Sequence, residues 1–110
     1  MTLIEFEHDI YAVATVSSIC EIPTIRRLTS TSVNLRINVT MGGFIEAFYN
    51  AHTGTVAFAW IYDEQRAFGA DNTGGWHIHP FEAPESHRAV SEPITFADFV
   101  AELERYATSE

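Results

Sequence analysis

The chain has 110 residues, of which 46% are hydrophobic, and this length and composition fit a single domain spanning residues 1–110 around one modest core. Fifteen acidic residues against six arginines, with no lysine, give a formal net charge of −9, which disfavours long-range attraction of nucleic acid. No stretch approaches the roughly 18 consecutive apolar residues of a membrane-spanning helix, and the first residues lack the basic and apolar regions of a secretory signal, so we expect a cytoplasmic protein without membrane contact.

The first predicted element is a helix near the N-terminus. Ile10 and Val13 belong to a set of apolar residues at roughly helical spacing, and Pro23 must end any helix that precedes it. We therefore predict a helix from about Glu7 to Ser18, although its β-branched residues favour a helix only weakly.

A change to period-two patterning predicts an antiparallel β meander of four to five strands after this helix. In SVNLRINVT, residues 32–40, apolar and polar side chains alternate without a break. Glycine-containing turns separate the later segments, and Gly42-Gly43 is typical of a hairpin. The segments that we expect to extend are IPTIRRLTS, SVNLRINVT, GFIEAFYN, TVAFAWIYD, RAFGAD and WHIHPF.

The chain ends in a predicted loop and a second helix. Residues 82–93 are polar and contain two prolines, which indicates a loop. Thr95 is a candidate N-cap with Asp98 at the third helical position, the pattern of a capping box. An apolar stripe follows, formed by Phe96, Phe99, Val100, Leu103 and Tyr106. The predicted fold class is α+β, with a helix at each end of the meander and both helices covering one sheet face.

Three of the five histidines lie close together in the sequence. His77 and His79 are two residues apart on an extended segment, so both side chains leave the same face, and His87 follows eight residues later. Such rings could be metal ligands, with a third ligand from His87, Asp71 or Glu82. They could instead form an acid–base pair, or be polar residues whose hydrogen bonds a covering loop satisfies. The spacing alone leaves these three interpretations open.

The neighbours of these histidines also have two interpretations each. Asp71 precedes Asn72-Thr73-Gly74-Gly75, where a carboxylate commonly bonds to turn backbone, but it could also orient an imidazole across the turn. Trp76 could belong to the core or offer a stacking surface to a nucleobase, and the core is the favoured interpretation.

The other residues that could take part in a functional site are two arginines, two histidines and the cysteine. Arg36 and Arg66 could bind phosphate through their forked guanidinium groups, or simply neutralise nearby acids. His8 and His52 are isolated and are interpreted as surface residues. Cys20, the single cysteine, is expected to be a small buried apolar side chain. No Walker sequence, nucleophile elbow or Cys-x-x-Cys motif is present.

The acidity has two explanations. It could match a basic partner, or it could be a halophilic composition spread over the whole surface, where high salt shortens the range of electrostatic forces. The complete absence of lysine favours salt adaptation. In that case the net charge is a poor guide to the ligand.

The order of these segments resembles the TumE family of small toxin–antitoxin proteins and its uncharacterised relatives. The segments that carry the resemblance are YAVATVSSIC, TIRRLTS, LRINVTMGGFIEAFYN, FAWIYDEQRAFGADN and EPITFADFVAELE, together with Asp71-Asn72 and the histidines that follow. The resemblance covers nearly the whole chain. It implies a toxin encoded beside a small DNA-binding antitoxin, with RNA or the translation machinery as its target.

The leading prediction is therefore a TumE-like toxin that acts as a metal-independent ribonuclease without a cofactor. His77 and His79 would be acid and base, Asp71 would orient them, and Arg66 would contact phosphate. Its expected partners are the cognate antitoxin, RNA and a second copy of the chain that pairs through an open sheet edge. The alternatives are a non-catalytic protein-interaction module and a small metal-binding protein that uses His77, His79 and His87.

Overall fold

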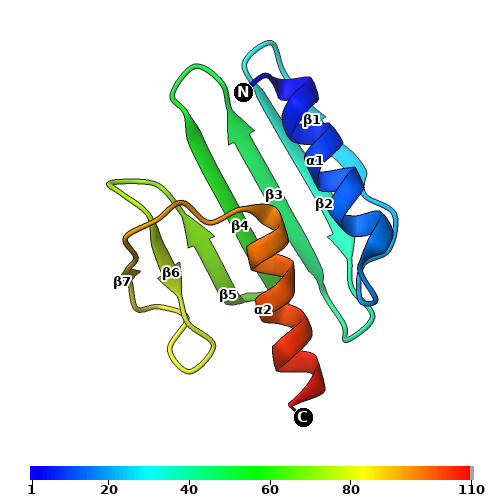
Figure 1. Ribbon diagram of the computed structural model, residues 1–110, viewed down its shortest axis with the longest axis vertical. Coiled ribbons are helices and arrows are strands. Elements are labelled where there is room, and N and C mark those ends of the chain that lie inside the picture. Colours follow the sequence, from blue (N-terminus) through cyan, green and yellow to red (C-terminus); the bar gives the residue numbers. More distant parts are fainter. Residues whose placement is uncertain (110) are drawn as a thin grey trace.

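The computed structural model describes residues 1–109, so residue 110 of the predicted domain lies outside the described residues. The elements are α1 (Leu3–Val16), β1 (Thr24–Leu28), β2 (Ser32–Asn38), β3 (Phe44–Asn50), β4 (Thr55–Tyr62), β5 (Gln65–Asp71), β6 (His77–His79), β7 (Arg88–Ala89) and α2 (Phe96–Thr108). The α+β class is confirmed, with a helix before and after an antiparallel sheet (Figure 1).

The sheet has seven strands in the order β1-β2-β3-β4-β5-β6-β7, so each strand pairs with its neighbours in the chain. The predicted count of four to five strands was therefore too low. The last strand, β7, lies inside the segment 82–93 that was expected to be a loop. It consists of Arg88 and Ala89, which pair with Ile78 and His77 of β6. Two exposed residues carry no alternating pattern, so only this pairing with β6 identifies the strand.

Both helices begin at a capping box. In α2 the predicted reciprocal bonds between Thr95 and Asp98 are present. In α1 the Thr2 hydroxyl accepts from the Glu5 amide, and the Glu5 carboxylate accepts from the Thr2 amide. Because this cap fixes the first turn, α1 begins at Leu3 and not near Glu7 as predicted, and it ends at Val16. No helix within residues 1–109 is long and apolar enough to cross a membrane.

The two faces of the sheet have different surroundings. Both helices lie on one face (Figure 1), where they pack against alternate strand residues and bury the core. Rings from α2 join strand rings there; Phe99, for example, lies 5.5 Å from Phe58 and 5.1 Å from Phe68 between ring centroids. The buried core residues in the strands include Val33, Leu35, Ile37, Ile45, Ala47, Phe58, Trp60, Phe68 and Ala70.

No helix within residues 1–109 covers the opposite face, which we call the open face. The strand register aligns ten of its residues in two neighbouring cross-strand rows. One row is Asn34, Phe48, Ala57, Asp71 and His77, and the other is Arg36, Glu46, Ala59, Gly69 and His79. The polar residues of the predicted site thus lie on the open face.

Candidate functional site

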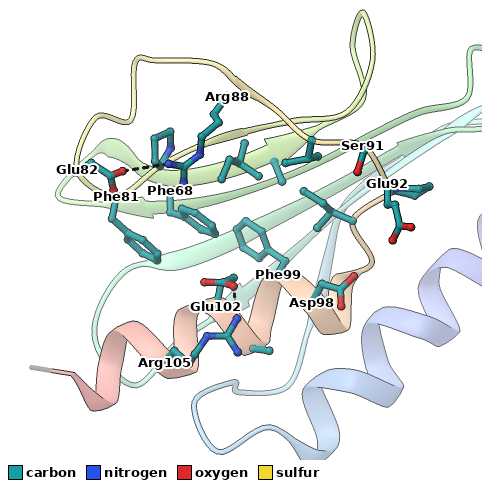
Figure 2. A pocket seen from close by; sticks show the side chains of 17 residues that line it. Phe68, Phe81, Glu82, Arg88, Ser91, Glu92, Asp98, Phe99, Glu102 and Arg105 are labelled. Carbon is teal, nitrogen blue, oxygen red and sulfur yellow. Dashed lines mark hydrogen bonds and ion pairs between the residues drawn. The ribbon is translucent and has the colours of Figure 1, made fainter.

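A cavity on the helix-covered face contains no histidine. Its volume is about 530 Å³, and Phe68, Phe81 and Phe99 project into it between α2 and the last strands (Figure 2). The arginines at its rim are neutralised by acids: Arg88 lies 3.6 Å from Glu82, and Arg105 pairs with Glu102. Because both of its arginines are already paired with acids and no histidine lines it, we place the candidate chemistry on the open face instead.

The site begins at the turn between β5 and β6. Asp71 is the last residue of β5, and its Oδ1 accepts a hydrogen bond of 3.0 Å from the Thr73 amide. Gly74 and Gly75 have φ values of +70° and +106°, which glycine adopts without strain. The turn role predicted for Asp71 is therefore present, and the same turn returns the chain so that His77 pairs with Asp71 across the strands.

The Asp71 carboxylate also contacts both strand histidines. Its Oδ2 lies 3.2 Å from His79 Nε2, and its Oδ1 lies 3.3 Å from His77 Nε2. Burial alone would raise the pKa of Asp71. The Thr73 amide, the hydrogen bond with His79 and the nearby charge of both rings oppose this and lower the pKa below its ordinary value. The Asp71 carboxylate thus bonds to the turn backbone and lies against both imidazoles, which are the contacts that its two predicted roles require.

His79 is the most enclosed of the three rings. Only 2% of the residue is exposed, and its Nδ1 has no hydrogen-bond partner within residues 1–109. When Nε2–H donates to Asp71, the neutral ring carries its lone pair on Nδ1. A buried polar atom without a partner costs free energy unless another group binds it. His79 therefore presents an unshared imidazole lone pair inside the fold.

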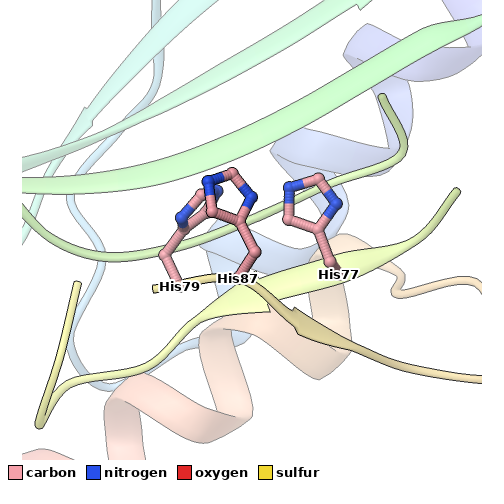
Figure 3. Close-up of side chains that lie close together, drawn as sticks. All are labelled: His77, His79 and His87. Atoms are coloured by element: carbon pink, nitrogen blue, oxygen red, sulfur yellow. The ribbon is translucent and has the colours of Figure 1, made fainter. Parts of the chain in front are cut away.

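His77 and His87 bring two more rings to the same place. The Nδ1 of His77 lies 3.1 Å from the Gly75 carbonyl oxygen, which orients the ring. His87 precedes β7, is exposed, and has its ring centroid 4.5 Å from that of His79 and 4.8 Å from that of His77. One nitrogen from each ring lies within 4.8 Å of the others. We call these three residues the histidine cluster, and Figure 3 shows that its rings rise together on the side away from α2.

Gly69 allows side chains to approach the cluster closely. A Cβ atom at this position would lie 3.3 Å from His79 Cδ2 and 3.0 Å from Arg66 Cδ, so both side chains lie over the bare backbone of Gly69. Arg66 Nη2 donates to the Pro84 carbonyl oxygen over 3.3 Å, which ties β5 to the loop before His87. We did not predict this role of Gly69, although a glycine inside a strand is a recognised sign of such close approach.

The structure brings together four of the predicted residues, His77, His79, His87 and Asp71, with Arg66 beside them. Arg36 shares the open face, but β3, β4 and β5 separate its strand from β6. It lies 3.5 Å from Glu46 and stacks over the ring of Phe44.

The remaining candidates lie outside the cluster. Trp76 is half-buried and packs against the core, the favoured interpretation. Glu82, considered as a ligand, lies at the cavity rim beside Arg88. His8 and His52 are exposed as predicted, and Cys20 is half-buried.

Comparisons with protein-family models, with curated proteins and with solved structures found no match to this chain.

Proposed function

We propose that this protein binds one transition-metal ion through His77, His79 and His87. The observation that carries the proposal is the buried Nδ1 of His79, which has no partner within residues 1–109 and belongs to a cluster whose nitrogens lie within 4.8 Å of one another. Metal-bound histidines usually donate their second ring nitrogen to a carboxylate or a backbone carbonyl. Asp71 supplies that acceptor to His79, and the Gly75 carbonyl supplies it to His77, so the nitrogen of His77 left for the metal is Nε2, which lies 3.3 Å from Asp71 Oδ1.

The ligand set also limits the choice of metal. Three neutral imidazoles suit zinc, copper, nickel and cobalt, whereas calcium and magnesium prefer oxygen ligands. A three-histidine site leaves one tetrahedral position for water or a ligand, the arrangement of a catalytic zinc site and not of a closed structural one. We therefore take zinc as the first metal to test.

The test is metal binding by purified protein that carries no histidine tag. After removal of metal with a chelator, the protein is titrated with Zn²⁺ in a calorimeter, and Co²⁺ is added separately so that its visible absorption reports the coordination. We expect a stoichiometry near one and tetrahedral Co²⁺ bands.

The chain offers matched controls for this test. His87→Ala removes an exposed ligand, and His52→Ala removes an exposed histidine far along the chain from the cluster. His87→Ala should weaken binding at least tenfold, and His52→Ala should leave it unchanged. A wild-type stoichiometry near zero, or equal affinity of the two variants, would rule out the site.

A second candidate is the TumE-like toxin with ribonuclease activity. It is supported by the contact of Asp71 with His77 and His79 and by Arg66 beside them, a set that can move protons and bind phosphate. Because His79 is almost fully buried, His77 and His87 are the rings that would meet RNA. In this proposal the protein acts in the cytoplasm on RNA.

A toxin of this kind would also bind partners, namely an antitoxin and a second copy of the chain. The outer edge strand β1 is exposed throughout and includes Ile25 and Leu28, which are 45% and 58% exposed, so it is the edge we assign to them. Induced expression in a bacterial host should arrest growth, and His77→Ala should relieve the arrest. Normal growth at high expression of the wild-type chain would contradict this second candidate.

A further inference from the structure

The local charge around the histidine cluster would become positive when a metal binds. Asp71 is the one carboxylate that contacts the cluster within residues 1–109, while the rings that coordinate a metal must be neutral. A divalent ion and the guanidinium of Arg66 together outweigh this single negative charge. In a chain of net charge −9, the loaded cluster would thus become a local positive site.

Arg66 is available to bind an anion at this place. Within residues 1–109 it has no carboxylate within ion-pair distance, and its one side-chain hydrogen bond, from Nη2 to the Pro84 carbonyl oxygen, leaves other guanidinium N–H groups free. Its stem lies over Gly69 next to His79, so the group lies on the open face beside the cluster. By contrast, Arg36, Arg88 and Arg105 are each paired with an acid.

Access to the cluster comes from the side of His87. His79 is 2% exposed and forms the floor, whereas His87 is exposed and belongs to the loop that Arg66 holds through Pro84. A ligand that binds the fourth position of the metal would therefore enter from solvent past His87, on the side where Arg66 lies.

We propose that the metal-loaded cluster binds a phosphate group, with one oxygen on the open metal position and Arg66 on the others. This inference rests on the proposed metal site. Phosphate fits because it carries up to two negative charges and offers separate oxygens to a metal and to a forked guanidinium. A phosphate monoester and inorganic phosphate share this chemistry, and the apo protein, which lacks the positive ion, should bind neither.

The experiment uses the full chain loaded with Co²⁺. Inorganic phosphate is titrated in while the visible bands of Co²⁺ are recorded, and a nucleoside monophosphate and acetate are titrated in parallel. We expect a saturable change in the bands with both phosphate compounds at lower concentration than with acetate. Arg66→Gln should need about tenfold more phosphate for half-saturation, because it loses charge-assisted hydrogen bonds. Arg105→Gln, an exposed arginine on α2, should match the wild type.

Two further measurements keep the outcomes distinct. Because Arg66 also bonds to the loop that carries His87, each variant is titrated with phosphate only after its own Co²⁺ bands have reached saturation, and Arg66→Lys should fall between the wild type and Arg66→Gln in phosphate affinity. If no Co²⁺ bands form at all, the proposed metal site fails. If the bands form but phosphate leaves them unchanged, or if Arg66→Gln binds phosphate as well as the wild type, the phosphate inference alone is overturned.

Discussion

The two faces of the sheet are built from the same strands but by different physical means. On the helix-covered face, apolar residues at alternate strand positions meet two amphipathic helices and form the core. On the open face, the arrangement depends on one turn, one glycine and one loop that places His87 beside β6. The helix-covered face therefore supplies most of the stability of the fold, whereas the open face holds the groups that are available for chemistry.

Substitutions at two neighbouring residues of β2, which point to opposite faces, should differ most in their effect on stability. Leu35 is fully buried, and Leu35→Ala should lower the free energy of unfolding by about 3 kcal/mol through lost burial and a residual cavity. Arg36 makes only a partly exposed ion pair with Glu46 and a contact with Phe44, so Arg36→Ala should cost less than about 1 kcal/mol. Urea unfolding followed by circular dichroism measures both, and equal losses would refute the division between the faces.

The next effect tests whether the open face gains stability from a metal. A ligand present at about one hundred times its dissociation constant stabilises the folded state by about 2.7 kcal/mol. Zn²⁺ should therefore raise the melting temperature of the wild type by several degrees. His87→Ala, which removes an exposed ring, should leave the metal-free melting temperature unchanged and remove the increase. His52→Ala serves as the control, and an increase that persists in His87→Ala would count against the cluster as the binding site.

The helix-covered face was the part that the sequence predicted well. Alternation in residues 32–40 and the stripe from Phe96 to Tyr106 identify both of its layers, because burial imposes a period on every residue involved. The start of α1 was missed because its signal is local, the capping box of Thr2 and Glu5, and not periodic.

The open face could be predicted only in part. The spacing of His77 and His79 fixes a shared face, which strand geometry guarantees. The approach of His87 depends on a loop and on a two-residue strand that has no pattern of its own. Arg36 shows that the correct face does not imply the correct position. The sequence predicted that Arg36 lies on the same face as the histidines, but it could not show that three strands separate β2 from β6.

A smaller loss of stability is expected when Asp71, which links the β5–β6 turn to the histidine rings, is changed. Asp71→Asn should lower the free energy of unfolding by about 1 kcal/mol at neutral pH, because charge-assisted hydrogen bonds to His79 and to the Thr73 amide become neutral ones. The pKa of Asp71 is lowered in the folded protein, so its contribution is present above the ordinary value of 3.8 and is lost as the pH falls through the folded value. Unfolding curves of wild type and variant should thus converge below about pH 4. A difference that stays constant down to acid pH would show that the charge of Asp71 is irrelevant to stability.

The reactivity of Cys20 should show the smallest change. This residue is half-buried at the margin of the helix-covered face, near the end of α1. Burial raises the pKa of the Cys20 thiol, the Ser17 hydroxyl opposes this by hydrogen bonding, and the charge of Glu104 raises it further. Because the thiolate is the reactive form, the folded protein should react with a thiol reagent at pH 8 several-fold more slowly than the same chain in urea. Glu104→Gln should speed the reaction modestly by removing a nearby negative charge. Glu102→Gln changes a charge on the same helix that pairs with Arg105, and it should have no effect. Equal rates in the two variants would show that burial alone governs the thiol, and a folded rate equal to that in urea would show that this margin of the core is open to solvent.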